Sequence, residues 1–299
     1  MSNFLLIFLC VVAGLLLRRI PAFPENVHVG LNAFIIYVSL PAISLRYIPA
    51  LDLSAEMLLP FLSGLIVMGG ALLFFWLLQF IFRWPAATLG ALMLVCGLGN
   101  TSFVGFPVTE ALYGAAGLQF AIFADQAAFL MLSFVGISVA AAYSGQRLSL
   151  MQLGRRVVSF PPFIAFLLAL GLAAGGWQAP EALDTVLAQL GGTLTPLALF
   201  SVGYQLRLQT RDLSWSAFGL GLGYKLLLAP LLVWAIFAAF TAPDTLPVQV
   251  AVLESGMPPM VTASIVATQY RLNPPLANLL VGLGLVAAVP SLYLWWQVL

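Results

Sequence analysis

The chain has 299 residues, of which 62% are hydrophobic and only 7% charged, whereas a soluble domain is roughly 45–50% apolar and about 25% charged. A surface in contact with water cannot be built from this composition, so we expect an integral membrane protein. The net charge of +1 and the scattered basic residues give no reason to expect a nucleic-acid partner.

Apolar segments bounded by charges, Pro or Gly predict ten membrane-spanning helices, because one crossing needs about 20 largely apolar residues. The first segment, Ser2–Leu17, is interpreted as a span rather than a cleaved leader, since Arg18 and Arg19 follow it instead of preceding it. In chain order the predicted spans are 3–18, 31–48, 58–82, 86–109, 118–143, 160–178, 190–206, 214–240, 247–270 and 276–298.

Basic residues are concentrated in alternate connections, which by the positive-inside rule places those connections in the cytoplasm of a cell membrane and both termini outside it. The odd-numbered connections hold Arg18, Arg19, Arg83, Arg147, Arg155, Arg156, Arg207, Arg211 and Arg271. The even-numbered connections hold Arg46 together with Asp52, Glu56, Glu110, Glu181, Asp184 and Asp244.

The most basic connection, 144–159, divides the chain into repeats 1–143 and 160–299 with five spans each. Since five is odd, two equivalent halves must be inverted in the membrane. The pair Pro24-Glu25 recurs as Pro180-Glu181. The fold class predicted here is an all-α polytopic membrane protein built from two inverted five-helix repeats.

The fourth and ninth predicted spans are both interrupted by Gly and Pro, at 97–107 and 254–262. Matched interruptions in inverted halves are the best sequence indication of a transporter binding site. The alternative is that these are ordinary kinks whose backbone groups pair with neighbouring helices. In the functional interpretation, half-helix N-termini face a common point and attract an anion, with extra donors from Asn100, Thr101 and Ser102.

Ionisable side chains inside spans are rare and are functional candidates by default. Lys225, Glu254 and Asp125 are expected at similar depth, so Lys225 can pair with either acid, and such a pair can also be purely structural. Glu254 first, and Asp125 second, are the candidates for binding and releasing a proton or holding a cation. Arg46 and Glu110 lie at span ends and are interpreted as interfacial side chains.

The whole chain resembles the auxin efflux carrier family of permeases through three segments, Tyr37-Val-Ser-Leu-Pro-Ala42, Gly99–Pro107 and Glu254–Ala263. The resemblance implies crossed, broken helices four and nine, a scaffold of spans 1, 2, 6 and 7 that is often dimeric, and a transport domain of spans 3–5 and 8–10 that moves as an elevator. It also implies auxin or small carboxylates such as malonate and malate as substrates. The binding roles carried over fall on Asn100, Pro107, Glu254, Pro258 and Pro259.

One departure from plant auxin carriers is the short connection 144–159, which favours a bacterial-type carboxylate permease. We therefore expect a secondary transporter of a small organic anion, driven by a proton gradient or the membrane potential, with substrate contacts that include Lys225. A sodium-coupled symporter is the alternative, and an intramembrane enzyme or a channel are less favoured. No nucleotide-binding loop, resident cofactor or metal site is expected.

Overall fold

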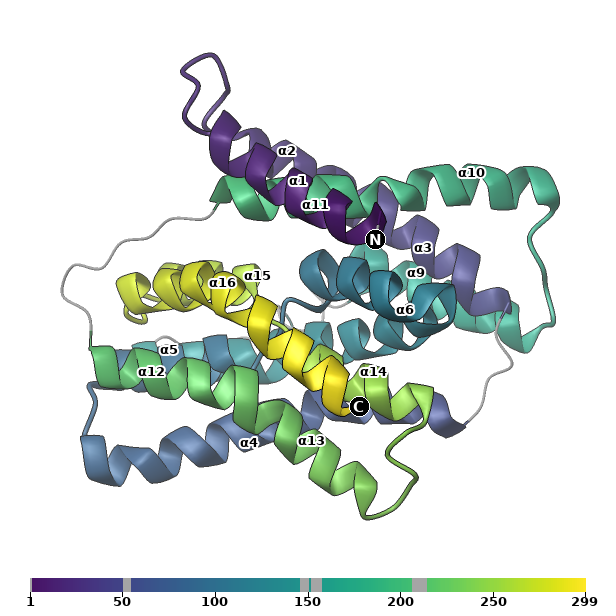
Figure 1. The fold of residues 1–299 in the computed structure, drawn as a ribbon. Helices are drawn as coiled ribbons and strands as arrows, with labels where there is room; N and C mark the ends of the chain where they lie inside the picture. Colours follow the sequence, from purple (N-terminus) through teal and green to yellow (C-terminus); the bar gives the residue numbers. More distant parts are fainter. Residues whose placement is uncertain (1, 51–54, 146–150, 152–157, 206–213) are drawn as a thin grey trace. The chain divides into compact units, whose positions relative to one another are not determined.

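The computed structural model describes residues 2–50, 55–145, 151, 158–205 and 214–299, and these are almost entirely helical (Figure 1). Within them, six helical segments are long and apolar enough to cross a membrane: Val27–Ala50, Ala55–Phe82, Thr101–Ser144, Glu181–Tyr204, Trp215–Ala238 and Pro274–Val298. Shorter apolar helices are Ala86–Cys96, Pro161–Ala174 and Leu246–Ser255. The predicted multi-spanning helical membrane protein is confirmed, and the number of ten crossings stays a prediction.

The chain divides into two compact units. Unit 1 comprises Met1–Ala55, Ser102–Ile122 and Arg155–Leu206, and unit 2 comprises Glu56–Thr101, Phe123–Gly154 and Arg207–Leu299. Arg147, Arg155 and Arg156 of the predicted basic connection, together with Asp52, Arg207 and Arg211, lie outside the described residues.

Unit 1 contains α1 (Ser2–Leu17), α2 (Val27–Phe34), α3 (Leu40–Tyr47), α9 (Pro161–Ala174), α10 (Glu181–Gly192) and α11 (Leu194–Gln205). A π turn, Ile35–Ser39, joins α2 to α3, and Pro41 is the second residue of α3. This proline cannot donate a backbone hydrogen bond to the turn before it, which favours the irregular turn at this point. Helices α1 and α11 pack side by side. A side chain at Gly14 would collide with the backbone of α11, only 2.7 Å from the Tyr204 nitrogen.

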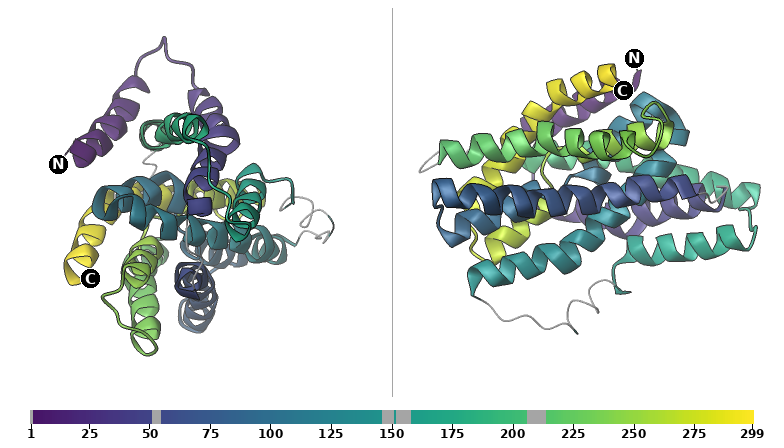
Figure 2. Two further views of the ribbon diagram at one scale, coloured as in Figure 1. Left: turned by 90° about the vertical axis from the view of Figure 1, so that its right-hand side faces the viewer. Right: turned by 90° about the horizontal axis from the view of Figure 1, so that it is seen from below.

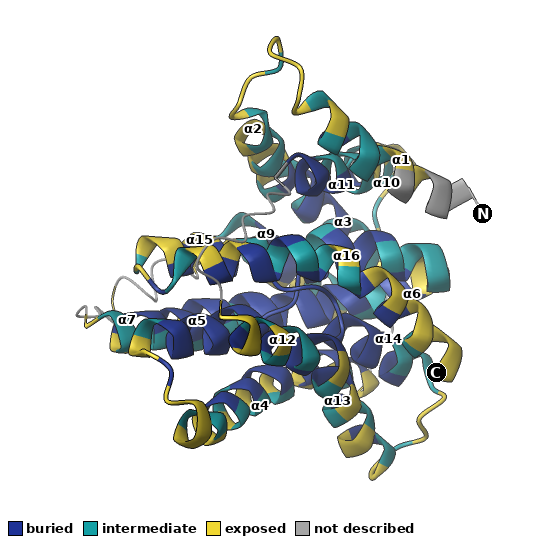
Figure 3. Ribbon diagram, turned by 60° about the vertical axis from the view of Figure 1, so that its left-hand side comes forward, coloured by how far each residue is buried: buried dark blue, intermediate teal, exposed yellow. Residues whose placement is uncertain are grey.

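Unit 2 is built around α5 (Ala86–Cys96), whose residues from Thr88 to Cys96 are all buried (Figure 3). A helix that is apolar on every side has no face to offer to water, which explains its central position. Helix α5 contacts α4 (Leu58–Phe82), α7 (Ile137–Ser144), α12 (Trp215–Gly223), α15 (Val261–Gln269) and α16 (Pro274–Val298), while α13 (Ala229–Ala238) and α14 (Leu246–Ser255) pack on α4 and on each other. Seen from below in Figure 2, α4 runs beside α13, with which it is in contact.

Both interruptions expected from the sequence are present in the structure. Helix α5 ends at Cys96 and the helical path resumes at Thr101, while α14 ends at Ser255 and α15 begins at Val261. Beyond the first interruption, a π turn, Thr101–Gly105, leads into α6 (Phe106–Leu130). Within the predicted gap between 109 and 118, two helical stretches of α6 meet at a kink at Gly114, whose φ of +66° suits glycine and turns the chain sharply.

Candidate functional site

The two helix interruptions of unit 2 pair with each other. Gly99 and Pro259 form an antiparallel bridge, the Asn100 amide donates to the Pro258 carbonyl at 2.8 Å, and the Met260 amide donates to the Leu98 carbonyl at 3.1 Å. Unpaired backbone groups are costly at membrane depth, and this exchange satisfies several of them. Pro258 and Pro259 have no backbone N–H group, so the hydrogen bond from the second interruption to the first is donated by Met260.

Helix ends of opposite polarity meet at this pairing, which we call the crossing (residues 97–101 and 254–260). Helices α5 and α14 end there with carbonyl groups, and the helical stretches from Thr101 and Val261 begin there with N–H groups. Helix ends with free carbonyl groups favour cations, and helix ends with free N–H groups favour anions. The crossing therefore offers both signs of partial charge within one protein-lined region.

Lys225, the single lysine of the sequence, lies at the crossing and is fully buried. A π turn, Tyr224–Leu228, carries it, and its ammonium group donates to the Ser255 carbonyl at 2.5 Å. An added Cβ on Gly99 would lie 3.2 Å from the Lys225 Nζ atom. Glycine at this position thus leaves space for the ammonium group against the backbone of the first interruption.

The two predicted acids also lie in unit 2 and are buried, Glu254 with 1% and Asp125 with 6% of its surface exposed. Asp125 accepts a 2.6 Å hydrogen bond from the Thr101 hydroxyl. Glu254 and Lys225 line one small cavity together with Thr101, and its volume is about 20 Å³. That is room for about one water molecule or a bare ion, so an organic anion does not fit between these side chains in this conformation.

Seven of the nine predicted substrate-binding and coupling residues are thus buried together at the crossing or, in the case of Asp125, hydrogen-bonded to it. Asn100, Thr101, Pro258 and Pro259 belong to its backbone, and Lys225 and Glu254 line its cavity. Ser102 and Pro107 belong to unit 1. Pro107 lines a different cavity there, of about 320 Å³.

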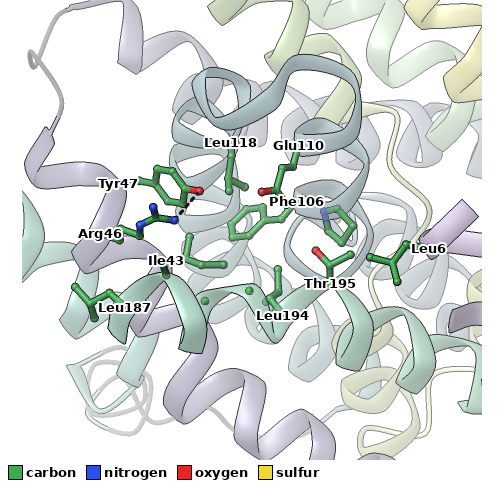
Figure 4. Close-up of a pocket in the computed structure, with 14 residues that line it drawn as sticks. Leu6, Ile43, Arg46, Tyr47, Phe106, Glu110, Leu118, Leu187, Leu194 and Thr195 are labelled. Atoms are coloured by element: carbon green, nitrogen blue, oxygen red, sulfur yellow. Dashed lines mark hydrogen bonds between the residues drawn. The ribbon is translucent and has the colours of Figure 1, made fainter. Parts of the chain in front are cut away.

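The unit 1 cavity, which we call the arginine pocket, is lined by residues of α3, α6, α10 and α11 and by Leu6 (Figure 4). Its charged side chains are Arg46 and Glu110, and Tyr47 and Thr195 contribute hydroxyl groups. Arg46 Nε lies 3.1 Å from Asp184 Oδ1, and Arg46 Nη1 donates to the Tyr47 hydroxyl at 3.4 Å.

Sequence reasoning had set Arg46 and Glu110 aside as interfacial residues and so missed this pocket. The signal that could have found them is the same one that selected Lys225, an ionisable side chain near or inside an apolar span. Arg46 and its partner Asp184 are separated by 138 positions, so no local pattern connects them.

Comparison with known proteins relates this chain to transporters. A sequence model of the family described as membrane transport protein matches residues 1–296. An uncharacterized transporter of Methanothermobacter thermautotrophicus is 28% identical, over 98% of this chain and 96% of the relative. An uncharacterized transporter of Methanocaldococcus jannaschii is 27% identical, over 91% and 90%. A proposed malonate transporter of Rhizobium meliloti is 28% identical, over 86% and 82%.

Proposed function

The chain belongs to the membrane transport protein family, the family of auxin efflux carriers that its motifs resemble, and we propose that it is a secondary active transporter of small organic carboxylates. It is a multi-pass membrane transporter and not an enzyme. The observation that carries the proposal is the crossing, where two interrupted helices expose helix ends of both polarities beside buried Lys225 and Glu254.

Interrupted helices are tolerated in a membrane only where protein or an internal cavity surrounds their free backbone groups. Discontinuous helices also position ions and anionic substrates in known transporter folds. These two facts support a transport role for the crossing. In this proposal Asn100, Thr101, Ser102, Pro107, Pro258, Pro259 and Lys225 contact the substrate anion as the crossing opens.

The proposed architecture is ten membrane helices in two inverted halves, working by an elevator motion in the cell membrane with both termini outside. The division into two units supports it, because unit 1 contains the predicted scaffold spans 1, 2, 6 and 7 and unit 2 contains most of spans 3–5 and all of 8–10. Residues 102–122, which end span 4 and begin span 5, group with unit 1 instead. A homodimer through the scaffold spans is part of the same proposal.

The proposed substrate is a mono- or dicarboxylate such as malonate, malate or an auxin-like acid. The Rhizobium relative, named for malonate, supports this class. A positively charged Lys225 and the N-terminal helix ends at the crossing favour an anion over a cation on electrostatic grounds.

The proposed energy source is a proton gradient or the membrane potential, with Glu254 and then Asp125 as the coupling groups. The buried ammonium of Lys225 bonds the Ser255 carbonyl, which is the kind of oxygen that a sodium ion would need. This contact favours proton or potential coupling, and a sodium-coupled symporter is the second candidate.

Exchange of labelled malonate by the purified protein in lipid vesicles tests the proposal. We expect saturable exchange that is unchanged when choline replaces sodium. Loss of exchange in choline would favour the sodium-coupled alternative, and the absence of exchange with every small mono- and dicarboxylate would overturn the proposed function.

Glu254→Gln tests the coupling role. One proton carried per substrate supports about tenfold accumulation across a gradient of one pH unit, and we expect the variant to exchange malonate but to lose this accumulation. Glu56→Gln, which removes an exposed acid elsewhere in unit 2, should accumulate malonate normally. Accumulation by Glu254→Gln equal to that of Glu56→Gln would exclude Glu254 as the coupling group.

A further inference from the structure

The arginine pocket of unit 1 has the size of a ligand site. Its volume is about 320 Å³, at the lower end of the roughly 300–1,000 Å³ range of small-molecule sites. Every residue that lines it belongs to unit 1. Helices that are distant in the sequence build it: α3 contributes Ile43, Arg46 and Tyr47, and α6 contributes Phe106 and Glu110.

Arg46 is held in place for binding a carboxylate. Asp184 fixes its Nε atom and Tyr47 its Nη1 atom, and the guanidinium carbon lies 5.2 Å from the centre of the Tyr47 ring. A guanidinium group has five N–H donors, and no residue in the described part of the chain accepts a hydrogen bond from Nη2. A fixed guanidinium with a remaining donor edge is the preferred protein group for a carboxylate.

Glu110 gives the same pocket a hydrogen-bond acceptor. Figure 4 shows its carboxyl group turned into the pocket, on the side where Arg46 and Tyr47 lie. The Thr195 hydroxyl enters from α11, and Ile43, Phe106 and Leu187 supply apolar surface. A ligand here meets one cationic group, one anionic group and an apolar wall.

The charges select among carboxylates. Asp184 compensates the charge of Arg46, so an ionised Glu110 leaves the pocket with a net negative charge. A dianion would be repelled, because like charges in a partly desolvated site disfavour each other. A single carboxylate beside a hydrogen-bond donor is complementary, since the carboxylate reaches Arg46 and the donor reaches Glu110.

We propose that the arginine pocket binds a small monoanionic carboxylate that carries a neighbouring hydrogen-bond donor, such as a 2-hydroxy acid or a singly protonated dicarboxylate. Arg46 binds the carboxylate and Glu110 accepts the hydrogen bond from the donor. The proposal rests on the proposed transport of carboxylates and narrows its substrate class, with the pocket as the site of selection.

Lactate and propionate are a matched pair of probes, because they differ only by the 2-hydroxyl group. Thermal-shift titrations of the purified full-length protein at pH 7.5, with lactate, propionate or malonate, measure binding without transport. A hydrogen bond to a charged group corresponds to about a tenfold change in Kd, so we expect lactate to bind about tenfold more tightly than propionate and malonate dianion to bind most weakly.

Variants assign this pattern to the pocket. In Glu110→Gln we expect the preference for lactate over propionate to shrink and the affinity for malonate to rise, because the repelling charge is gone. Arg46→Gln should lose binding of both monocarboxylates. Arg46→Lys keeps the charge but lacks the paired N–H donors of the guanidinium group, so we expect it to bind both monocarboxylates more weakly than wild type. Glu181→Gln, an exposed change on α10 outside the pocket, is the matched control and should behave as wild type.

Two outcomes overturn the inference: equal binding of lactate and propionate by the wild type, or an unchanged binding pattern in both Arg46→Gln and Glu110→Gln. In either case malonate exchange in vesicles still decides the proposed function on its own. Conversely, the expected binding pattern without exchange of any carboxylate would support the pocket and refute the transport proposal.

Discussion

Two cavities of this protein, one at the crossing and one at Arg46, accommodate charged side chains in an apolar chain in different ways. At the crossing in unit 2, Lys225 and Glu254 are buried beside a space of about 20 Å³, and the Ser255 carbonyl accepts a hydrogen bond from the Lys225 ammonium group. In the arginine pocket of unit 1, Arg46 lines a space of about 320 Å³, and Arg46 and its ion-pair partner Asp184, which lies outside the lining, are partly exposed, 31% and 45%. In this conformation the first space has room for a proton or a small ion, and the second has room for an organic molecule.

This difference predicts that removing a charged side chain at the crossing lowers the free energy of unfolding more than removing one at the arginine pocket. Lys225→Met has the largest expected effect, because it removes the donor to the buried Ser255 carbonyl. An unsatisfied buried acceptor costs about 1–3 kcal/mol, so we expect a lower melting temperature and loss of malonate exchange. Melting by intrinsic fluorescence and exchange in vesicles measure the two effects. A Lys225→Met protein as stable and active as wild type would remove the crossing from the mechanism.

Thr101→Val has the next largest expected effect. It keeps the side-chain shape but removes the 2.6 Å hydrogen bond to Asp125, which leaves a buried carboxyl group without this donor. The expected loss of unfolding free energy is about 1–2 kcal/mol, with slower exchange. Thr268→Val is the control, since the Thr268 hydroxyl is exposed and bonds only the preceding turn of its own helix. Equal stability of the two variants would argue against a structural role for the Thr101–Asp125 contact.

Asp184→Asn has the smallest expected effect on stability. The Arg46–Asp184 pair is partly exposed, and such pairs contribute about 0–1 kcal/mol. We expect a melting temperature close to that of wild type and tighter binding of carboxylates, because Arg46 loses its compensating charge. A loss of stability as large as that of Lys225→Met would contradict the comparison between the two cavities.

Much of this architecture could be predicted from the sequence because its causes are local. Apolar length identified the helices, and Gly and Pro located both interruptions within a few residues. The same reasoning separated 86–109 from 118–143, and in the structure two helical stretches meet between them at a kink at Gly114. The intervening residues contain no proline, and a single glycine with positive φ makes the turn.

The candidate site was predictable only in part. Rarity of charge inside apolar spans selected Lys225, Glu254 and Asp125, and all three are buried in unit 2. The same rule was not applied to Arg46 and Glu110, whose position near span ends favoured an interfacial interpretation. Their shared pocket forms because α3 packs against α10 and because α6 lines the same space. The position of a residue near the end of a span gives no information about this packing.

The sequence by itself determined that this chain is a helical membrane protein with two interrupted helices and a few charges placed among apolar residues. These properties act within about 20 residues, the length of one membrane crossing. Only the tertiary structure decided that Gly99 pairs with Pro259, that Lys225 bonds Ser255, and that a cavity of about 320 Å³ lies beside Arg46. Cavity volume and charge pairing depend on helices far apart in the chain, and packing alone brings those together.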